Sequence, residues 1–217
     1  MKKFLFISLL LFIVPFGFAR DLNDPPWDLS LPNQTSQAWE FTDVTFPGNP
    51  IEPVISENPY GPSYIDLELT TATFTWPDYV LGPDEVEIAT LHIDTPGGLT
   101  IWVPNNPDEN LKKLIFWQVT SDKSPTPTGS GPTATTPSGS TGTNLPSPYP
   151  QIQHGSTPWY TYNGLIEIVP NPEGEWITFD FVESTNIEEI VIKTICVPEP
   201  GTLILLGIGG LLLRKRK

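Results

Sequence analysis

Apolar and polar residues alternate in short runs along the middle of the chain, the pattern of strands that bury one face. In residues 64–70 every second side chain is aliphatic, and the positions between them carry Asp, Glu and Thr. Residues 114–119 and 176–181 alternate in the same way. Because helical periodicity is absent from this part of the sequence, the pattern predicts β-strands joined by turns.

With five further alternating runs, these segments predict about eight strands, separated by turn signals rich in Pro, Gly and Asn. The further runs are residues 38–44, 86–93, 99–103, 163–169 and 187–195. This number is typical of an all-β fold, an antiparallel two-sheet sandwich of jelly-roll-like kind. An immunoglobulin-like sandwich is the alternative, because strand order cannot be derived from one sequence.

Residues 124–150 interrupt the alternation with a segment rich in Ser, Thr, Pro and Gly. This segment has almost no large apolar residue whose burial could offset the entropy cost of ordering it. We therefore expect a disordered loop inserted in a single domain, residues 20–196, because three strands after the loop are too few to close a core. The composition of the loop also suits O-glycosylation.

The N-terminus predicts a secretory signal peptide over residues 1–19. Two lysines precede a long apolar run, and Gly17 and Ala19 stand at the −3 and −1 positions of a cleavage site before Arg20. Signal peptidase is therefore an expected partner, and the chain is expected to be exported.

The C-terminus predicts a second, shorter apolar helix. Residues 201–213 form an apolar stretch of 13 residues, and a helix of this length spans only about 20 Å of a ~30 Å hydrocarbon core. The basic residues 214–217 that follow would stay on the inner side, which leaves the body of the chain on the outer side. The membrane is thus expected to hold the chain only through this helix.

The motif Val197, Pro198, Glu199, Pro200, followed by the apolar stretch and the basic end, resembles the PEP-CTERM sorting signal of exported bacterial proteins. The resemblance covers residues 197–217. It implies that the tail holds the protein at the inner membrane until an exosortase cuts near the motif. The mature protein would then reach the cell surface or the surrounding medium, released or attached.

The composition of the body narrows the choice of partners. The full chain has a formal net charge of −14, and residues 20–199 carry five basic and 25 acidic residues, a net charge of −20. This charge disfavours nucleic acid and anionic membrane surfaces. Calcium could bind to the acidic loops at residues 76–85 or 105–110, while no other cofactor is indicated.

No catalytic residue can be assigned from the sequence. The two histidines, His92 and His154, lie in no local catalytic motif. Cys196 is the one cysteine, so the chain has no internal disulfide. We expect Cys196 to be a buried structural residue rather than a reactive thiol. A small carbohydrate-active enzyme, a glycan hydrolase or lyase using paired carboxylates, is the alternative to a non-enzymatic protein.

Aromatic residues favour carbohydrate recognition as the specific function. Trp159, Tyr160 and Tyr162 crowd together beside the expected loop, where their rings could stack on sugars. Trp102 lies near another expected turn, and the alternative for all these rings is that they cover the ends of the core. The body also resembles planctomycete-type PEP-CTERM proteins with Trp-rich β-domains, a resemblance that carries over no catalytic residue. We expect an adhesion or carbohydrate-binding module of the cell surface, extracellular matrix or biofilm.

Overall fold

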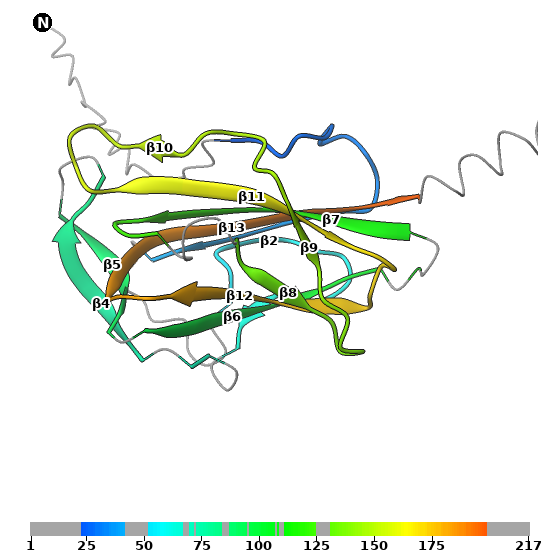
Figure 1. The fold of residues 1–217 in the computed structure, drawn as a ribbon, viewed down its shortest axis with the longest axis horizontal. Coiled ribbons are helices and arrows are strands. Elements are labelled where there is room, and N and C mark those ends of the chain that lie inside the picture. The colour runs from blue at the N-terminus through cyan, green and yellow to red at the C-terminus, as the bar shows by residue number, and fades with distance from the viewer. Residues whose placement is uncertain are drawn as a thin grey trace, which may run out of the picture.

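The computed structural model shows two antiparallel β-sheets packed face to face (Figure 1). It describes residues 23–41, 52–66, 70–71, 73–83, 87–94, 96–106, 108, 111–124 and 131–198. The described residues contain strands and turns but no helix. The predicted all-β, two-sheet sandwich of jelly-roll-like kind is confirmed.

The larger sheet has nine strands and the smaller has four. The larger sheet contains β1 (Gln34–Glu40), β2 (Ile55–Glu57), β4 (Phe74–Leu81), β5 (Glu87–Ile93), β7 (Leu111–Ser121), β9 (Thr143–Leu145), β10 (Ile152–Gln153), β11 (Tyr160–Ile168) and β13 (Thr185–Pro198). The smaller sheet contains β3 (Tyr64–Ile65), β6 (Gly97–Pro104), β8 (Thr133–Thr135) and β12 (Gly174–Phe181), in the order β3-β6-β12-β8.

Strand β13 lies at the centre of the larger sheet. Along its length it pairs with β7, and on its other side it pairs first with β5 and then with β1. A bulge between Ile187 and Glu189 shifts the register with β7 near the start of the strand. Both edges of β13 are thus hydrogen-bonded for most of its 14 residues.

The core lies between the two sheets and is built from alternate residues of the long strands. Ile115, Trp117 and Val119 of β7 and Ile190 and Ile192 of β13 point into it from the larger sheet. The smaller sheet contributes Leu99, Ile101, Val103, Ile177, Phe179 and Phe181. Trp117 meets Phe179 across the interface in an edge-to-face contact, with ring centroids 5.8 Å apart.

The outer face of the larger sheet is also covered. Phe116, Gln118 and Val191 alternate away from the core but are buried. Segments before β1 and between β9 and β10 run across this face (Figure 1), where the Tyr149 ring packs edge-on against Phe116 at 6.1 Å. The central strands are therefore buried on both sides.

The expected disordered loop over residues 124–150 needs correction. Strand β8 pairs with β12, and strand β9 pairs with β11, so two short stretches within residues 131–150 extend the two sheets. Ala134 is buried in the core. A segment poor in large side chains is ordered here because its backbone groups bond to strand edges and one small side chain fits the core. Residues 125–130 lie outside the described residues, and O-glycosylation stays a prediction.

The two ends of the chain lie mostly outside the described residues. These undescribed parts include the cleavage position Ala19–Arg20, the motif residues Glu199 and Pro200, and both expected apolar helices. In the part of the chain that is described, no helix has the length and apolar character needed to span a membrane. Strand β13, however, continues through Val197 and Pro198, which pair with Lys112 and Leu111.

Ala134 provides a test of the ordered segment. We expect Ala134→Asp to destabilise the fold by roughly 3 to 5 kcal/mol, because the change places an unpaired carboxylate in the core. Thr133→Asp, on the exposed side of the same strand, should change stability by no more than about 0.5 kcal/mol. Denaturant unfolding measures the free energy of unfolding of both variants. Equal small effects would show that this segment is a loop outside the fold.

Candidate functional site

Three aromatic side chains form a row across the outer face of the smaller sheet. Tyr64 of β3 lies opposite Trp102 of β6, and Trp102 lies opposite Trp176 of β12. Their neighbours along the strands, such as Ile65 and Ile101, are fully buried, so the row points away from the core. All three rings are partly exposed. We call this surface the aromatic row.

The two tryptophans of the aromatic row are in contact. Their ring centroids are 4.8 Å apart and their planes are inclined by 49°. Gly174 on β12 makes this arrangement feasible, because a Cβ at that position would come within 2.4 Å of the Trp102 ring. The Trp102 indole therefore lies over the backbone of β12, in space that any other residue would fill.

Polar side chains form a second row beside the aromatic one. Thr100 and Thr178 face each other with their hydroxyl oxygens 3.1 Å apart, and Thr133 continues the row on β8. The backbone amide of Asp66 donates to the carbonyl of Thr100, which places Asp66 at the other end. Asp180, two residues beyond Thr178, is exposed. Hydroxyl and carboxylate groups thus lie along one side of the aromatic rings.

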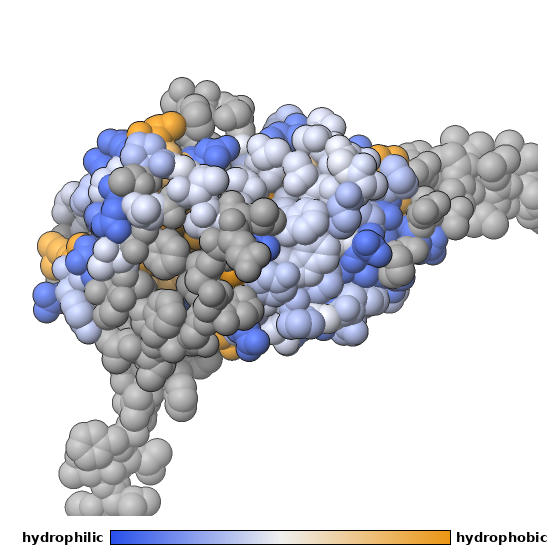
Figure 2. Space-filling view, turned by 90° about the horizontal axis from the view of Figure 1, so that it is seen from below, coloured by the Kyte–Doolittle hydropathy of each residue, from blue (hydrophilic) through white to orange (hydrophobic). Residues whose placement is uncertain are grey.

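Figure 2 shows the molecule from the side of the smaller sheet. Pale residues of intermediate hydropathy fill the right-hand part of this view, and hydrophilic residues lie near its edge. A surface of this kind, with aromatic rings and adjacent hydroxyls, can bind molecules that have both an apolar face and polar edges.

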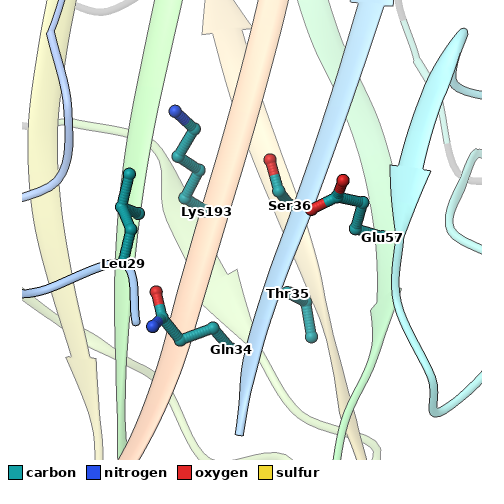
Figure 3. A pocket seen from close by; sticks show the side chains of 6 residues that line it. All are labelled: Leu29, Gln34, Thr35, Ser36, Glu57 and Lys193. Carbon is teal, nitrogen blue, oxygen red and sulfur yellow. The ribbon is translucent and has the colours of Figure 1, made fainter. Parts of the chain in front are cut away.

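The larger sheet carries a separate hollow of about 240 Å³ on its outer face (Figure 3). It is lined by Leu29, Gln34, Thr35, Ser36, Glu57 and Lys193. The side-chain amide of Gln34 is already engaged, since it accepts from Trp27 Nε1 and donates to the carbonyls of Asp28 and Leu31. Lys193 Nζ lies 3.7 Å from Asp24 Oδ1. Since Gln34 and Lys193 already contact residues outside the hollow, this hollow is a weaker candidate than the aromatic row.

Trp159, which the sequence suggested as a sugar-stacking residue, is buried. Only 1% of it is exposed, and its indole N–H donates to the carbonyl of Leu81 at 2.8 Å. The expectation for Trp159 is therefore corrected, because a buried ring offers no face to a ligand. The position of Trp159 in the sequence, between the expected loop and a turn, did not indicate that its ring is buried against the end of β4.

Tyr160 and Tyr162 are half-buried on β11, with ring centroids 6.0 Å apart. Tyr162 packs against the core, and this burial is the main cause of the raised pKa of its hydroxyl. Both tyrosines belong to the larger sheet and stand apart from the aromatic row. Their role in ligand binding stays a prediction.

The two histidines hydrogen-bond to neighbouring strands and turns. His92 on β5 lies between Asn186, 2.7 Å from Nδ1, and Ser184, 3.0 Å from Nε2. The Asn186 amide donates to Asp122, so its oxygen faces the histidine and the ring nitrogen Nδ1 is the donor. His154 Nε2 lies 2.8 Å from the hydroxyl of Thr161.

Cys196 is buried near the end of β13, as expected for a structural residue. Its sulfur contacts Asn105 Oδ1 at 3.1 Å and Asn171 Oδ1 at 3.5 Å. Burial is the largest cause of the raised pKa of this thiol. Among the described residues, no group of three or more His, Cys, Asp or Glu side chains is arranged to hold a metal ion. Both loops suggested for calcium are only partly described, so that suggestion stays a prediction.

Comparisons with known proteins bear mainly on the tail. Residues 197–217 match the family model of the PEP-CTERM protein-sorting motif. This match confirms the expected sorting signal and marks the chain as an exported, exosortase-sorted protein. A search of curated proteins finds no match. The resemblance of the body to planctomycete-type proteins stays a prediction.

Among solved structures, the chain is similar to TmCBM27, a carbohydrate-binding module described by its specific mannan recognition. The two chains are 11% identical, and the match covers 73% of this chain and 96% of the module, with a TM-score of 0.33.

A substitution at Gly174 tests the close packing of the Trp102 ring in the aromatic row. We expect Gly174→Ala to cost roughly 1 to 3 kcal/mol of stability, because the new methyl group would displace the Trp102 ring. In a Trp102→Ala background the same change should cost much less, since the space is then empty. A double-mutant cycle by denaturant unfolding measures this coupling, and additive effects would contradict the close contact.

Proposed function

We propose that this exported protein is a non-catalytic carbohydrate-binding or adhesion module, and that the aromatic row of Tyr64, Trp102 and Trp176 is its binding face. The observation that carries the proposal is the register of β3, β6 and β12, which brings the three rings into one line. Sugar rings have an apolar face that stacks on aromatic side chains and a polar edge that needs hydrogen bonds. The aromatic row supplies the stacking faces, and the partly exposed Thr178 with the exposed Thr133 and Asp180 beside it supply polar groups.

The dimensions of the row favour an extended glycan. Three neighbouring strands span about 10 Å, since adjacent strands lie roughly 4.8 Å apart. A chain lying across the strands can therefore contact more than one ring. The inclination of 49° between the tryptophan planes suits a ligand whose successive units are turned relative to one another.

Charge favours a neutral glycan over an anionic one. Asp66 belongs to the polar row, and Asp180 lies two residues beyond Thr178, while residues 20–199 have a net charge of −20. Uronic-acid or sulfated polymers would be repelled by this surface at low ionic strength. Stacking and hydroxyl hydrogen bonds need no metal ion, so calcium, if it binds, would act on the loops.

The sorting signal suggests where such a module works. Signal peptidase and an exosortase would process the chain during export, and the membrane would hold it only through the C-terminal helix before processing. The mature protein would then act at the cell surface or in extracellular polysaccharide, including biofilm matrix. Because β13 runs directly into Val197 and Pro198, a protein attached through its processed end would carry its sandwich close to the attachment point.

A second candidate function is a small carbohydrate-active enzyme, and one observation favours it. Ser184 Oγ, His92 and Asn186 Oδ1 form a continuous line of hydrogen bonds of 3.0 and 2.7 Å. A nucleophile, a base and a group that orients the base have this relation in hydrolases. Removal of acyl groups from a polysaccharide is the reaction that such a line would support.

Substitution of the tryptophans tests the binding face. We expect Trp102→Ala and Trp176→Ala each to weaken the binding of a neutral polysaccharide by about thirtyfold, the effect of truncating a central aromatic contact. Trp27→Ala, on the outer side of the larger sheet, is the matched control and should bind normally. Affinity electrophoresis against neutral and anionic polysaccharides, with and without calcium, provides the measurement. Unchanged affinity in both variants would rule out the aromatic row.

The alternative makes its own prediction at Ser184. If the second candidate function is correct, a fluorophosphonate probe should label the wild-type protein, and both Ser184→Ala and His92→Ala should abolish labelling. Ser156→Ala, at another exposed serine, is the control and should retain it. Without an activated nucleophile, the wild-type protein stays unlabelled and the second candidate is wrong.

A further inference from the structure

Two adjacent lysines of β7 form ion pairs in opposite environments. Lys112 Nζ lies 2.5 Å from Glu167 Oε2, and the two side chains are 23% and 28% exposed. Lys113 Nζ lies 2.7 Å from Glu175 Oε1, and both side chains are 0% exposed. Strand alternation explains the contrast, since successive side chains point to opposite faces of the sheet. Lys113 thus crosses the core from the larger sheet to β12 of the smaller one.

The buried pair has few polar neighbours. Apart from their mutual contact, the Lys113 amine and both Glu175 oxygens have no hydrogen-bond partner among the described residues. Val103, opposite Glu175, and Ile168, opposite Lys113, are apolar core residues. An ammonium group has three donors to satisfy, and a carboxylate has two acceptor oxygens. The charged forms are therefore poorly stabilised at this position.

Burial disfavours the charged form of the Glu175 carboxyl. It raises the pKa of the Glu175 carboxyl, an effect that outweighs the opposing influence of Lys113. Transfer of a proton from the ammonium to the carboxylate across this contact gives a neutral amine beside a neutral carboxylic acid. This is the pair of species that can condense, because only the unprotonated amine is a nucleophile and the neutral acid is the better electrophile.

We propose that Lys113 and Glu175 are joined by an isopeptide bond in the folded protein. The amine nitrogen attacks the carboxyl carbon of Glu175, which forms the N–C bond. The C–OH bond then breaks, and the hydroxyl group leaves with one amine proton as water. No oxidant, reductant or other reactant is required. The fold holds the reacting groups within hydrogen-bond distance, so the bimolecular reaction becomes intramolecular.

Polar side chains lie between the pair and the surface. Cys196 lies opposite Lys113 in the ladder, and its sulfur contacts the side chains of Asn105 and Asn171. Asn171 also lines a hollow of about 250 Å³ at the surface, beside the turn after β8. A chain of polar groups therefore leads from the vicinity of the pair to solvent.

The bond would have a mechanical consequence. It would link β7 of the larger sheet to β12 of the smaller one, and so hold the two layers of the sandwich together. With a single cysteine in the chain, no internal disulfide can do this. A covalent link between residues far apart in sequence reduces the entropy of the unfolded state, which suits a protein that works outside the cell.

Mass spectrometry of the wild-type protein tests the proposal, which does not depend on the proposed function. We expect the intact mass to be lower than the sequence mass by one water, about 18 Da. Trypsin should cleave after Lys112 but not after Lys113, and a branched peptide should connect the segments around Lys113 and Glu175. The Lys112–Glu167 pair is an internal control, because the same groups in contact with water should remain unlinked. A wild-type protein of full mass would overturn the proposal.

Two variants identify the source of the lost water. Lys113→Met should restore the full mass, while Lys112→Met should remain lighter by one water. If Lys113→Met keeps the lower mass, dehydration occurred elsewhere and the proposal is wrong. If Lys113→Met does not fold, the branched peptide of the wild-type protein decides the question alone.

Discussion

The structure depends on the placement of one long strand, β13, between β7 and β1. Its backbone groups are paired on both edges over most of its length, and its side chains are buried on both sides of the sheet. Isoleucines on its inner side meet aliphatic and aromatic residues of β6 and β12, which forms the core. A strand in this position cannot shift by one residue, because every side chain would then change faces.

The outer faces of the two sheets differ in the side chains they carry and in what covers them. Neighbouring segments cover part of the outer side of the larger sheet, where Phe116 packs against Tyr149. The smaller sheet carries hydroxyls and partly exposed rings instead. Gly174 contributes to this surface, because the absence of a side chain there lets the Trp102 ring lie over β12. The binding face proposed for the protein is thus the outer face of the smaller sheet.

The core also contains an electrostatic conflict. Lys113 and Glu175 occupy inward positions of strands that are otherwise apolar, and they have no partner except each other in the described part of the chain. A buried ion pair is seldom stabilising compared with apolar residues of the same shape. Condensation to an amide would remove both charges and replace a costly contact with a covalent link between the sheets.

The sequence by itself determined the class of fold and the C-terminal sorting signal. Alternation at 64–70, 114–119 and 176–181 predicts strands because the period of two is a local property, and the tail motif is readable because it is contiguous. Residues 131–150 carry no such local pattern, since their order comes from bonds to distant strand edges. Burial of Trp159, the alignment of Tyr64, Trp102 and Trp176, and the meeting of Lys113 with Glu175 were decided by the tertiary structure alone. Each depends on strand register and sheet packing, which join residues far apart in the chain and leave no local pattern in the sequence.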